Sequence, residues 1–192
     1  MDDNRLPSRR GFLRGGAGLA AAALVPGRAA AKARQGDDGL YTQDWYVEGF
    51  LDLPEDFAAA RAKGRTFALQ WSQRGCVYCK ELHTAYFADP AIEAPIRDAF
   101  DIVHLDLFGA REVTFLDGTR LSEKALGQRE RVRATPTFQF FAEVNGAPKE
   151  VARMPGLLPR KEFSALFRYV AQGAYRDGPF DAWLARQSAG KG

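Results

Sequence analysis

The chain is short of cysteine, histidine and methionine, with only two of each among its 192 residues. The two cysteines, Cys76 and Cys79, lie so close together that cross-linking them would remove little entropy from the unfolded chain, which excludes a stabilising disulfide framework. A structural zinc site needs four ligands, and only His83 and His104 could complete one around the cysteines. We therefore expect no metal and no cofactor. The 46% of hydrophobic residues is enough for one domain with an ordinary core.

Long hydrophobic runs are also absent. The run from Gly15 to Val25 is too short and too rich in glycine to span a membrane. It follows Ser8-Arg9-Arg10-Gly11-Phe12-Leu13-Arg14 and precedes two candidate cleavage sites, Ala29-Ala30-Ala31 and Ala31-Lys32-Ala33. This order is typical of an export signal, and the pair Arg9 and Arg10 resembles twin-arginine (Tat) signals. A disordered basic tail is the alternative. The resemblance implies export of the folded protein to a bacterial periplasm.

The positive charge of the whole chain belongs to this first segment. Residues 1–33 hold six of the 27 basic residues and two of the 24 acidic ones. The remainder has 21 basic and 22 acidic residues, a net charge of −1. Without a basic excess there is no reason to expect a nucleic-acid partner.

Cys76-Val77-Tyr78-Cys79 is the pattern with the most chemical meaning. It follows an apolar run over 66–71 that predicts a strand, and it precedes a helix-like run over 80–87. A cysteine at the start of a helix faces unpaired N–H groups and the positive end of the helix dipole, which favour a thiolate. The second thiol, one turn later, can attack a mixed disulfide and release the product. The spacing predicts thiol–disulfide exchange, with Cys76 as the nucleophile and Cys79 as the resolving cysteine.

Helix and strand patterns alternate along the rest of the chain. Pro54 and the acids after it start a helix that stops at Gly64, and the apolar run over 65–72 predicts a central strand. Further helices are expected over 76–87, 91–100, 122–132, 159–172 and 179–187, and further strands over 101–107, 137–141 and 149–154. This order predicts an α/β fold with a mixed central sheet flanked by helices on both faces.

Turn residues place two hairpins. Asn145-Gly146 joins the strands 137–141 and 149–154, and Asp117-Gly118 predicts a small hairpin insertion near 110–121. Residues 35–39 are expected to form a flexible linker. We divide the chain into a cleaved signal at 1–33, a linker and N-terminal segment at 34–49, a domain at 50–173 and a C-terminal helical extension at 174–192.

Four features together resemble the thioredoxin superfamily over residues 50–173. They are the cysteine pair after a strand, Thr135-Pro136-Thr137 before a later strand, the hairpin over 137–154, and Gly156 before the last long helix. Local strings are similar to periplasmic thioredoxins of the SoxW type, among them Phe87-Ala88-Asp89-Pro90, Arg111-Glu112-Val113-Thr114 and Val151-Ala152-Arg153-Met154-Pro155-Gly156. The resemblance implies a thioredoxin fold, the activity of a thiol–disulfide oxidoreductase, and a Cys76–Cys79 disulfide in the oxidised protein.

The resemblance also implies residues that bind a client. Pro136 would be a cis-proline facing the cysteine pair and would present the backbone of Thr135 to an incoming peptide. An ordinary trans-proline at the start of an edge strand is the alternative. Gly156 would belong to the same peptide-binding edge. Trp71 would shield the site, although core packing alone would also explain it.

Two features depart from the family pattern, and one histidine near the pair has two interpretations. Thioredoxins proper carry a buried acid six positions before the first cysteine, where this chain has Gln70, so Glu81 or a water would have to replace it. The dipeptide Val77-Tyr78 offers no charge to the thiolate, and we therefore expect a reductant rather than a strong oxidant. His83 is interpreted as a polar residue on a partly exposed face, with tuning of the thiols as the alternative.

The expected function is reduction of disulfides in periplasmic client proteins by a monomer. A CcdA/DsbD-like membrane partner would supply the electrons, and the SoxW likeness implies a sulfur-oxidation carrier protein or apocytochrome c as the client. Two alternatives stay open: a disulfide oxidase or isomerase of the same fold, and a non-redox module that binds client peptides beside Thr135. No membrane anchor is expected after signal cleavage.

Overall fold

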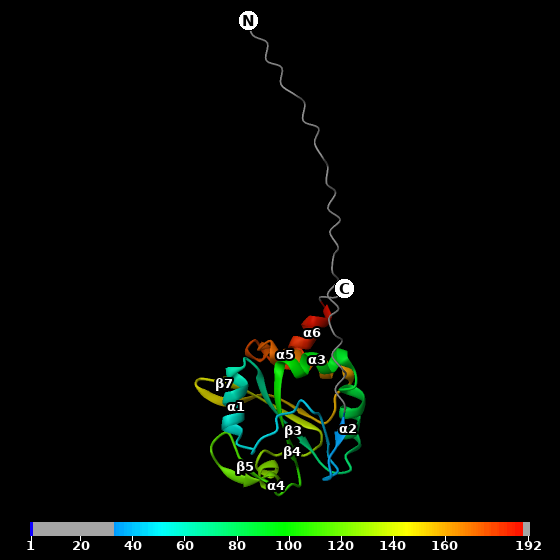
Figure 1. Ribbon diagram of the computed structural model, residues 1–192, viewed down its shortest axis with the longest axis vertical. Coiled ribbons are helices and arrows are strands. Elements are labelled where there is room, and N and C mark those ends of the chain that lie inside the picture. Colours follow the sequence, from blue (N-terminus) through cyan, green and yellow to red (C-terminus); the bar gives the residue numbers. More distant parts are fainter. Residues whose placement is uncertain (2–32, 190–192) are drawn as a thin grey trace.

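The computed structural model describes Met1 and residues 33–189. Its centre is a four-stranded sheet in the order β4-β3-β7-β8 (Figure 1). Strand β3 (Thr66–Ser72) runs parallel to β4 (Phe100–Asp106) and antiparallel to β7 (Thr137–Val144). Strand β7 forms a hairpin with β8 (Ala147–Pro155). The mixed sheet expected from the sequence is confirmed.

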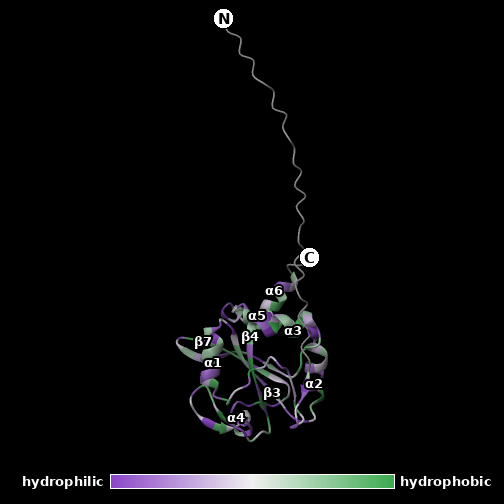
Figure 2. Ribbon diagram, viewed as in Figure 1, coloured by the Kyte–Doolittle hydropathy of each residue, from purple (hydrophilic) through white to green (hydrophobic). Residues whose placement is uncertain are grey.

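Helices cover both faces of this sheet, as the element order predicts. One face packs against the π-helical turn η1 (Leu82–Tyr86), α3 (Pro90–Ala99) and α5 (Arg160–Ala171). The other packs against α1 (Leu53–Ala62), α4 (Glu123–Arg129) and the small hairpin of β5 (Glu112–Thr114) and β6 (Arg120–Ser122). Figure 2 shows the hydrophobic residues gathered along the inner strands. The hairpin insertion expected near 110–121 is therefore confirmed as part of the second layer.

Aromatic rings fill the first face of the core. Phe138 and Phe140 of β7 lie 5.3 and 5.1 Å, centroid to centroid, from the ring of Phe167 on α5. Phe163, one turn earlier on α5, lies 4.8 Å from Phe167. Their spacing at i and i+4 puts both α5 rings on the face that the sequence pattern predicts to be buried. This packing fixes β7, which directly follows Thr135 and Pro136.

The predicted helix over 76–87 is not a single α-helix. It consists of α2 (Val77–Glu81) and η1, in which the Phe87 N–H donates to the Leu82 carbonyl oxygen at 3.0 Å. The wider π turn accommodates one more residue than an α turn, and such turns are frequent at functional sites. Here it directs Leu82, His83 and Tyr86 into the protein.

The expectation of a flexible linker at 35–39 is wrong. Strands β1 (Arg34–Gln35) and β2 (Tyr41–Thr42) pair as a small antiparallel hairpin. Its turn is held by the Asp38 side chain, which accepts the Leu40 N–H at 2.9 Å, and by Gly39 with a φ of 79°. Asp and Gly suit such a turn because one closes it by a local hydrogen bond and the other tolerates positive φ.

The chain after this hairpin continues along the outer edge of the sheet. The Val47 N–H donates to the Ile102 carbonyl oxygen at 2.9 Å, and Val47 forms a parallel bridge with Val103 of β4. In Figure 1 this N-terminal segment lies beside α2. The segment over 34–47 is therefore a fixed part of the structure.

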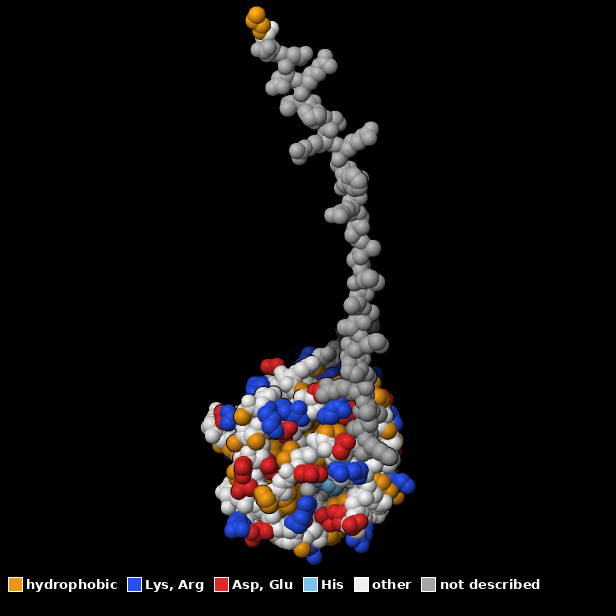
Figure 3. Space-filling view, viewed as in Figure 1, with side chains coloured by type: hydrophobic (Ala, Val, Ile, Leu, Met, Phe, Trp, Pro, Cys, Tyr) orange, Lys and Arg blue, Asp and Glu red, His pale blue; other side chains and the backbone are white. Residues whose placement is uncertain are grey.

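The C-terminal segment packs on α5. After a 3-10 turn, η2 (Ala174–Arg176), helix α6 (Phe180–Ala189) places Trp183 5.5 Å from the ring of Tyr169. Over residues 33–189, no helix combines the length and the apolar character needed to cross a membrane. On the face drawn in Figure 3, acidic and basic side chains are intermixed.

Candidate redox site

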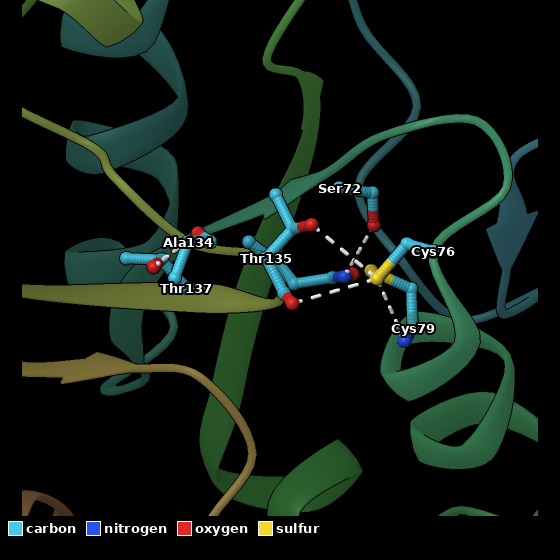
Figure 4. The surroundings of a disulfide bond; sticks show 7 residues. Ser72, Cys76, Cys79, Ala134, Thr135 and Thr137 are labelled. Carbon is cyan, nitrogen blue, oxygen red and sulfur yellow. Dashed lines mark hydrogen bonds between the residues drawn. A yellow bond between two sulfur atoms is a disulfide. The ribbon is translucent and has the colours of Figure 1, made fainter.

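The cysteine pair lies at the end of β3, where the chain turns into α2. Gly75, with a φ of 74°, makes the turn, and Cys76 caps the helix. Cys76 and Cys79 form a disulfide, with their Cα atoms 5.2 Å apart (Figure 4). The Cys79 N–H donates to the Cys76 sulfur at 3.0 Å. Cys79 is only 2% exposed and Cys76 is half-buried, so Cys76 is the more accessible of the two sulfurs.

Thr135 and Pro136 face the sulfur of Cys76. The peptide bond between them is cis. The Thr135 hydroxyl donates to the Cys76 sulfur at 3.3 Å, and the Thr135 carbonyl oxygen lies 3.5 Å from the same sulfur (Figure 4). The Thr137 hydroxyl donates to the Ala134 carbonyl oxygen at 2.7 Å, and this bond fixes the backbone of the segment between them. In the reduced protein the thiolate would keep two donors, the Cys79 N–H and the Thr135 hydroxyl, and both favour the charged form.

Gly156 lies beside this segment rather than at the sulfur. Its N–H donates to the Pro136 carbonyl oxygen at 2.8 Å, and its φ is 83°. The β7–β8 pairing ends at Thr137 and Pro155, and this hydrogen bond extends it by one step to Pro136 and Gly156. Gly156 acts on the site by holding Pro136 in place.

Removing the Thr135 hydroxyl tests its contribution to the thiolate. We expect Thr135→Val to slow alkylation of reduced Cys76 by iodoacetamide at neutral pH by about tenfold, because one hydrogen bond to a charged group contributes about 1.5 kcal/mol. The measurement is the alkylation rate across a pH series. Thr84→Val is the matched control, because its hydroxyl donates to the Lys80 carbonyl oxygen and not to sulfur. Equal rates for Thr135→Val and the wild type would show that the hydroxyl does not stabilise the thiolate.

The position of the missing acid is buried and neutral. Gln70 is completely buried, and its Nε2 donates to the Ser72 hydroxyl at 2.7 Å. The Ser72 hydroxyl lies next to the disulfide in Figure 4. Glu81, proposed above as a substitute, is exposed at the end of α2. A buried network of neutral groups, Gln70 and Ser72, therefore occupies the position where thioredoxins proper have a carboxylate.

His83 is buried, and the expectation of a partly exposed face is wrong. Its side chain is 1% exposed, and its ring lies 5.7 Å from that of Tyr46 and 6.1 Å from that of His104, centroid to centroid. Gln43 reaches it from the N-terminal segment, with Nε2 3.2 Å from both the His83 Nδ1 and its carbonyl oxygen. The sequence carried no local signal for this burial, because the partner Gln43 lies 40 positions away.

Both histidines are uncharged at neutral pH. Burial lowers the pKa of His83 well below its usual value, and the neighbouring His104 lowers it further. Burial also lowers the pKa of His104 to about 4, with Arg111 as the second cause. Among residues 33–189, no group of three or more His, Cys, Asp and Glu side chains is arranged to hold a metal ion.

Trp71 does not shield the site at the surface. It is completely buried, and its Nε1 donates to the Gln139 Oε1 at 2.6 Å. It belongs to the core cluster under α1 and α4, with Leu69 and Leu105. Alternation along β3 explains this, because Trp71 points to the opposite face from Ser72. Core packing, the alternative interpretation, is what the structure shows.

Three exposed hydrophobic side chains lie at the end of the sheet where the cysteine pair is found. Val77 and Tyr78, between the cysteines, are 73% and 61% exposed. Phe108 is 65% exposed and follows β4, whose last residue, Asp106, pairs with Ser72 at the end of β3. Phe108 therefore lies at the same end of the sheet as the cysteines, where β3 and β4 finish. The sequence analysis did not single out Phe108. Its position just after β4, a strand parallel to β3, could have indicated that it lies near the end of β3.

Comparison with known proteins agrees with this geometry. A thioredoxin-like domain model matches residues 53–171, and a model of the twin-arginine translocation signal matches residues 7–26, which include Arg9 and Arg10 but lie outside the described residues. The chain thus carries an export signal. No curated protein matches it.

Solved structures with similarity to this chain include a thioredoxin and a thioredoxin-fold protein. A thioredoxin from Thermus thermophilus is 30% identical, with 62% of this chain and 83% of that chain covered and a TM-score of 0.48. A thioredoxin-fold protein from Helicobacter pylori is 21% identical, with 65% of this chain and 80% of that chain covered and a TM-score of 0.52. The thioredoxin-like model covers well over half of the sequence and includes both cysteines of the redox pair. The chain therefore belongs to the thioredoxin-like domain family.

Proposed function

We propose that this protein reduces disulfides of client proteins in the bacterial periplasm. The observation that carries the proposal is the asymmetry of the pair: Cys76 is within reach of a client and accepts two hydrogen bonds, whereas Cys79 is buried behind it. A thiolate that is stabilised and accessible is the form that attacks a disulfide. The twin-arginine signal supports the compartment.

The reaction follows from this order of exposure. The Cys76 thiolate attacks one sulfur of the client disulfide, and the other client sulfur leaves and takes up a proton. Cys79 then loses its proton and attacks the Cys76 sulfur, which releases the second client thiol. The client gains two electrons and two protons, and the protein ends with the Cys76–Cys79 disulfide.

Electrons must then return to the pair from a donor. A membrane protein of the CcdA/DsbD type fits the compartment and the chemistry. The SoxW-like strings favour a sulfur-oxidation carrier protein or apocytochrome c as the client. The exposed Val77, Tyr78 and Phe108 support binding of a polypeptide rather than a small polar disulfide, because they offer apolar contact area at the end of the sheet that carries Cys76.

Catalysed reduction of a protein disulfide tests this proposal. We expect the mature protein, with dithiothreitol to regenerate it, to reduce an accessible protein disulfide much faster than dithiothreitol alone. The reduction potential of the pair should be about −270 mV, as for reducing thioredoxins, because Val77 and Tyr78 add no charge that would stabilise the thiolate further. A rate equal to that of dithiothreitol alone would end the proposal, and a potential of about −120 mV would favour an oxidase instead.

A further inference from the structure

A pocket of about 190 Å³ opens directly beside Cys76. One wall is the active-site turn and the first turn of α2, with Gln73 and Lys80, and the other is the N-terminal hairpin, with Gln35 and Tyr41. Its lining does not include Thr135 or Pro136, so it is distinct from the side of Cys76 that faces the cis-proline. Its volume is below the roughly 300 Å³ at which small-molecule sites usually begin, so it suits a single side chain.

The hairpin wall is fixed to the active-site turn. The Arg74 side chain donates through Nε to the Asp38 carbonyl oxygen at 2.8 Å, which links the tip of the hairpin to the residue before Gly75. Leu40 is buried in the same hairpin. Gln43 anchors the following residues to His83. The hairpin wall of the pocket is thus in place before any client arrives, and the residues that form it precede the thioredoxin-like match at 53–171.

The lining of this pocket is positively charged and rich in hydrogen-bond donors. Lys80 is its only charged residue, and the Gln73 amide and the Tyr41 hydroxyl supply further donors. The Gln35 amide donates to the Gly39 carbonyl oxygen at 3.2 Å. Lys80 makes no ion pair with any other residue in the part of the chain that the structure describes. The hairpin turn holds two acids, Asp37 and Asp38, and neither lines this pocket. Asp38 lines the neighbouring cavity, and its carboxylate accepts the Leu40 N–H.

We propose that this pocket receives a carboxylate side chain that flanks the disulfide cysteine of the client. The inference rests on the proposed function and adds a specificity element to it: Lys80 and the N-terminal hairpin select clients with Asp or Glu beside the attacked sulfur. Because Cys76 itself lines the pocket, a group bound there belongs to a residue next to that sulfur. A charged hydrogen bond at this place orients the client disulfide for attack.

The test uses two peptides, each with one internal disulfide, that differ only in having Glu or Gln on both sides of each cysteine. The rate of reduction by the mature protein is measured as kcat/KM with dithiothreitol regeneration. We expect the wild type to prefer the Glu peptide by about tenfold, the effect of one charged hydrogen bond. Lys80→Gln should bring the ratio close to one, and Lys80→Arg should retain most of it.

A matched control and a second variant guard against indirect effects. Lys149→Gln removes the same charge from β8, near the hairpin turn at the far end of the sheet, and should leave the ratio unchanged. Gln35→Ala alters the opposite wall without changing charge and should lower the ratio. Because each result is a ratio between peptides, a change in the intrinsic reactivity of Cys76 cancels.

The outcomes separate this inference from the proposed function. Equal reduction of both peptides by the wild type, or a preference that survives Lys80→Gln, would overturn the carboxylate site and leave the reductase function intact. Failure to reduce either peptide would overturn the proposed function, and the inference with it.

Discussion

Replacing Cys79 with serine is expected to leave a natural client covalently attached to Cys76. The variant can still attack a client disulfide, because Cys76 and its hydrogen-bond donor Thr135 are unchanged. It cannot resolve the mixed disulfide, since the buried position at 79 then carries a hydroxyl in place of a thiol. Turnover should fall to the level of the uncatalysed reaction while the trapped complex accumulates. The measurement is a non-reducing gel of periplasmic extract, followed by mass spectrometry of the band that a reductant releases.

Cys76→Ser is the matched control for this experiment. It keeps one thiol, but that thiol is buried, so neither attachment nor turnover is expected. If Cys76→Ser trapped clients as well as Cys79→Ser, the assignment of Cys76 as the nucleophile would be wrong. If neither variant trapped a protein while the wild type turned over a disulfide, the two-step mechanism would be excluded.

Acidification from pH 7 to pH 4 is expected to cost roughly 3 kcal/mol of the free energy of unfolding through His104 alone. Its pKa falls from 6.5 to about 4 on folding. The unfolded chain therefore binds a proton in this range that the folded protein does not. The contribution of His104 is fully present above pH 6.5 and is lost as the pH falls towards 4. His83 acts in the same direction, because its pKa is also lowered.

Urea unfolding at several pH values measures this effect. His83 and His104 are the only histidines in the chain, so a stability change between pH 6.5 and 5 has few other sources. Asp56 acts in the opposite sense, because burial raises the pKa of its carboxyl group. We expect His104→Gln to flatten the profile, whatever its stability at pH 7. A wild-type stability that is constant from pH 7 to 5 would contradict the burial of both histidines.

The parts of the fold predicted from sequence are those governed by local chemistry. Asn145 and Gly146 adopt the positive φ values, 53° and 79°, that the expected hairpin turn requires. Asp52 caps α1 by accepting the Glu55 N–H, and Pro54 lies in its first turn, so the helix begins where its residues indicate. In each case the signal and its structural effect lie within four residues.

The parts that could not be predicted depend on contacts between distant segments. Trp71 and Ser72 are neighbours in sequence, yet one packs in the core and the other lies at the disulfide, and only the pairing of the sheet decides which. The contact of Thr135 with Cys76 joins residues 59 positions apart. We could predict that contact only from the resemblance to the thioredoxin superfamily, because no pattern in the residues themselves indicates it.

The Val47 bridge has a consequence for self-association. An uncovered edge strand presents free N–H and C=O groups to which another chain can add, and this is a common route to aggregation. On β4, the Val47 N–H occupies one of these backbone groups by donating to the Ile102 carbonyl oxygen. At the opposite border, Pro148 and Pro155 remove two donors from β8. Both borders of the sheet thus offer fewer free backbone groups to which the strand of another molecule could add.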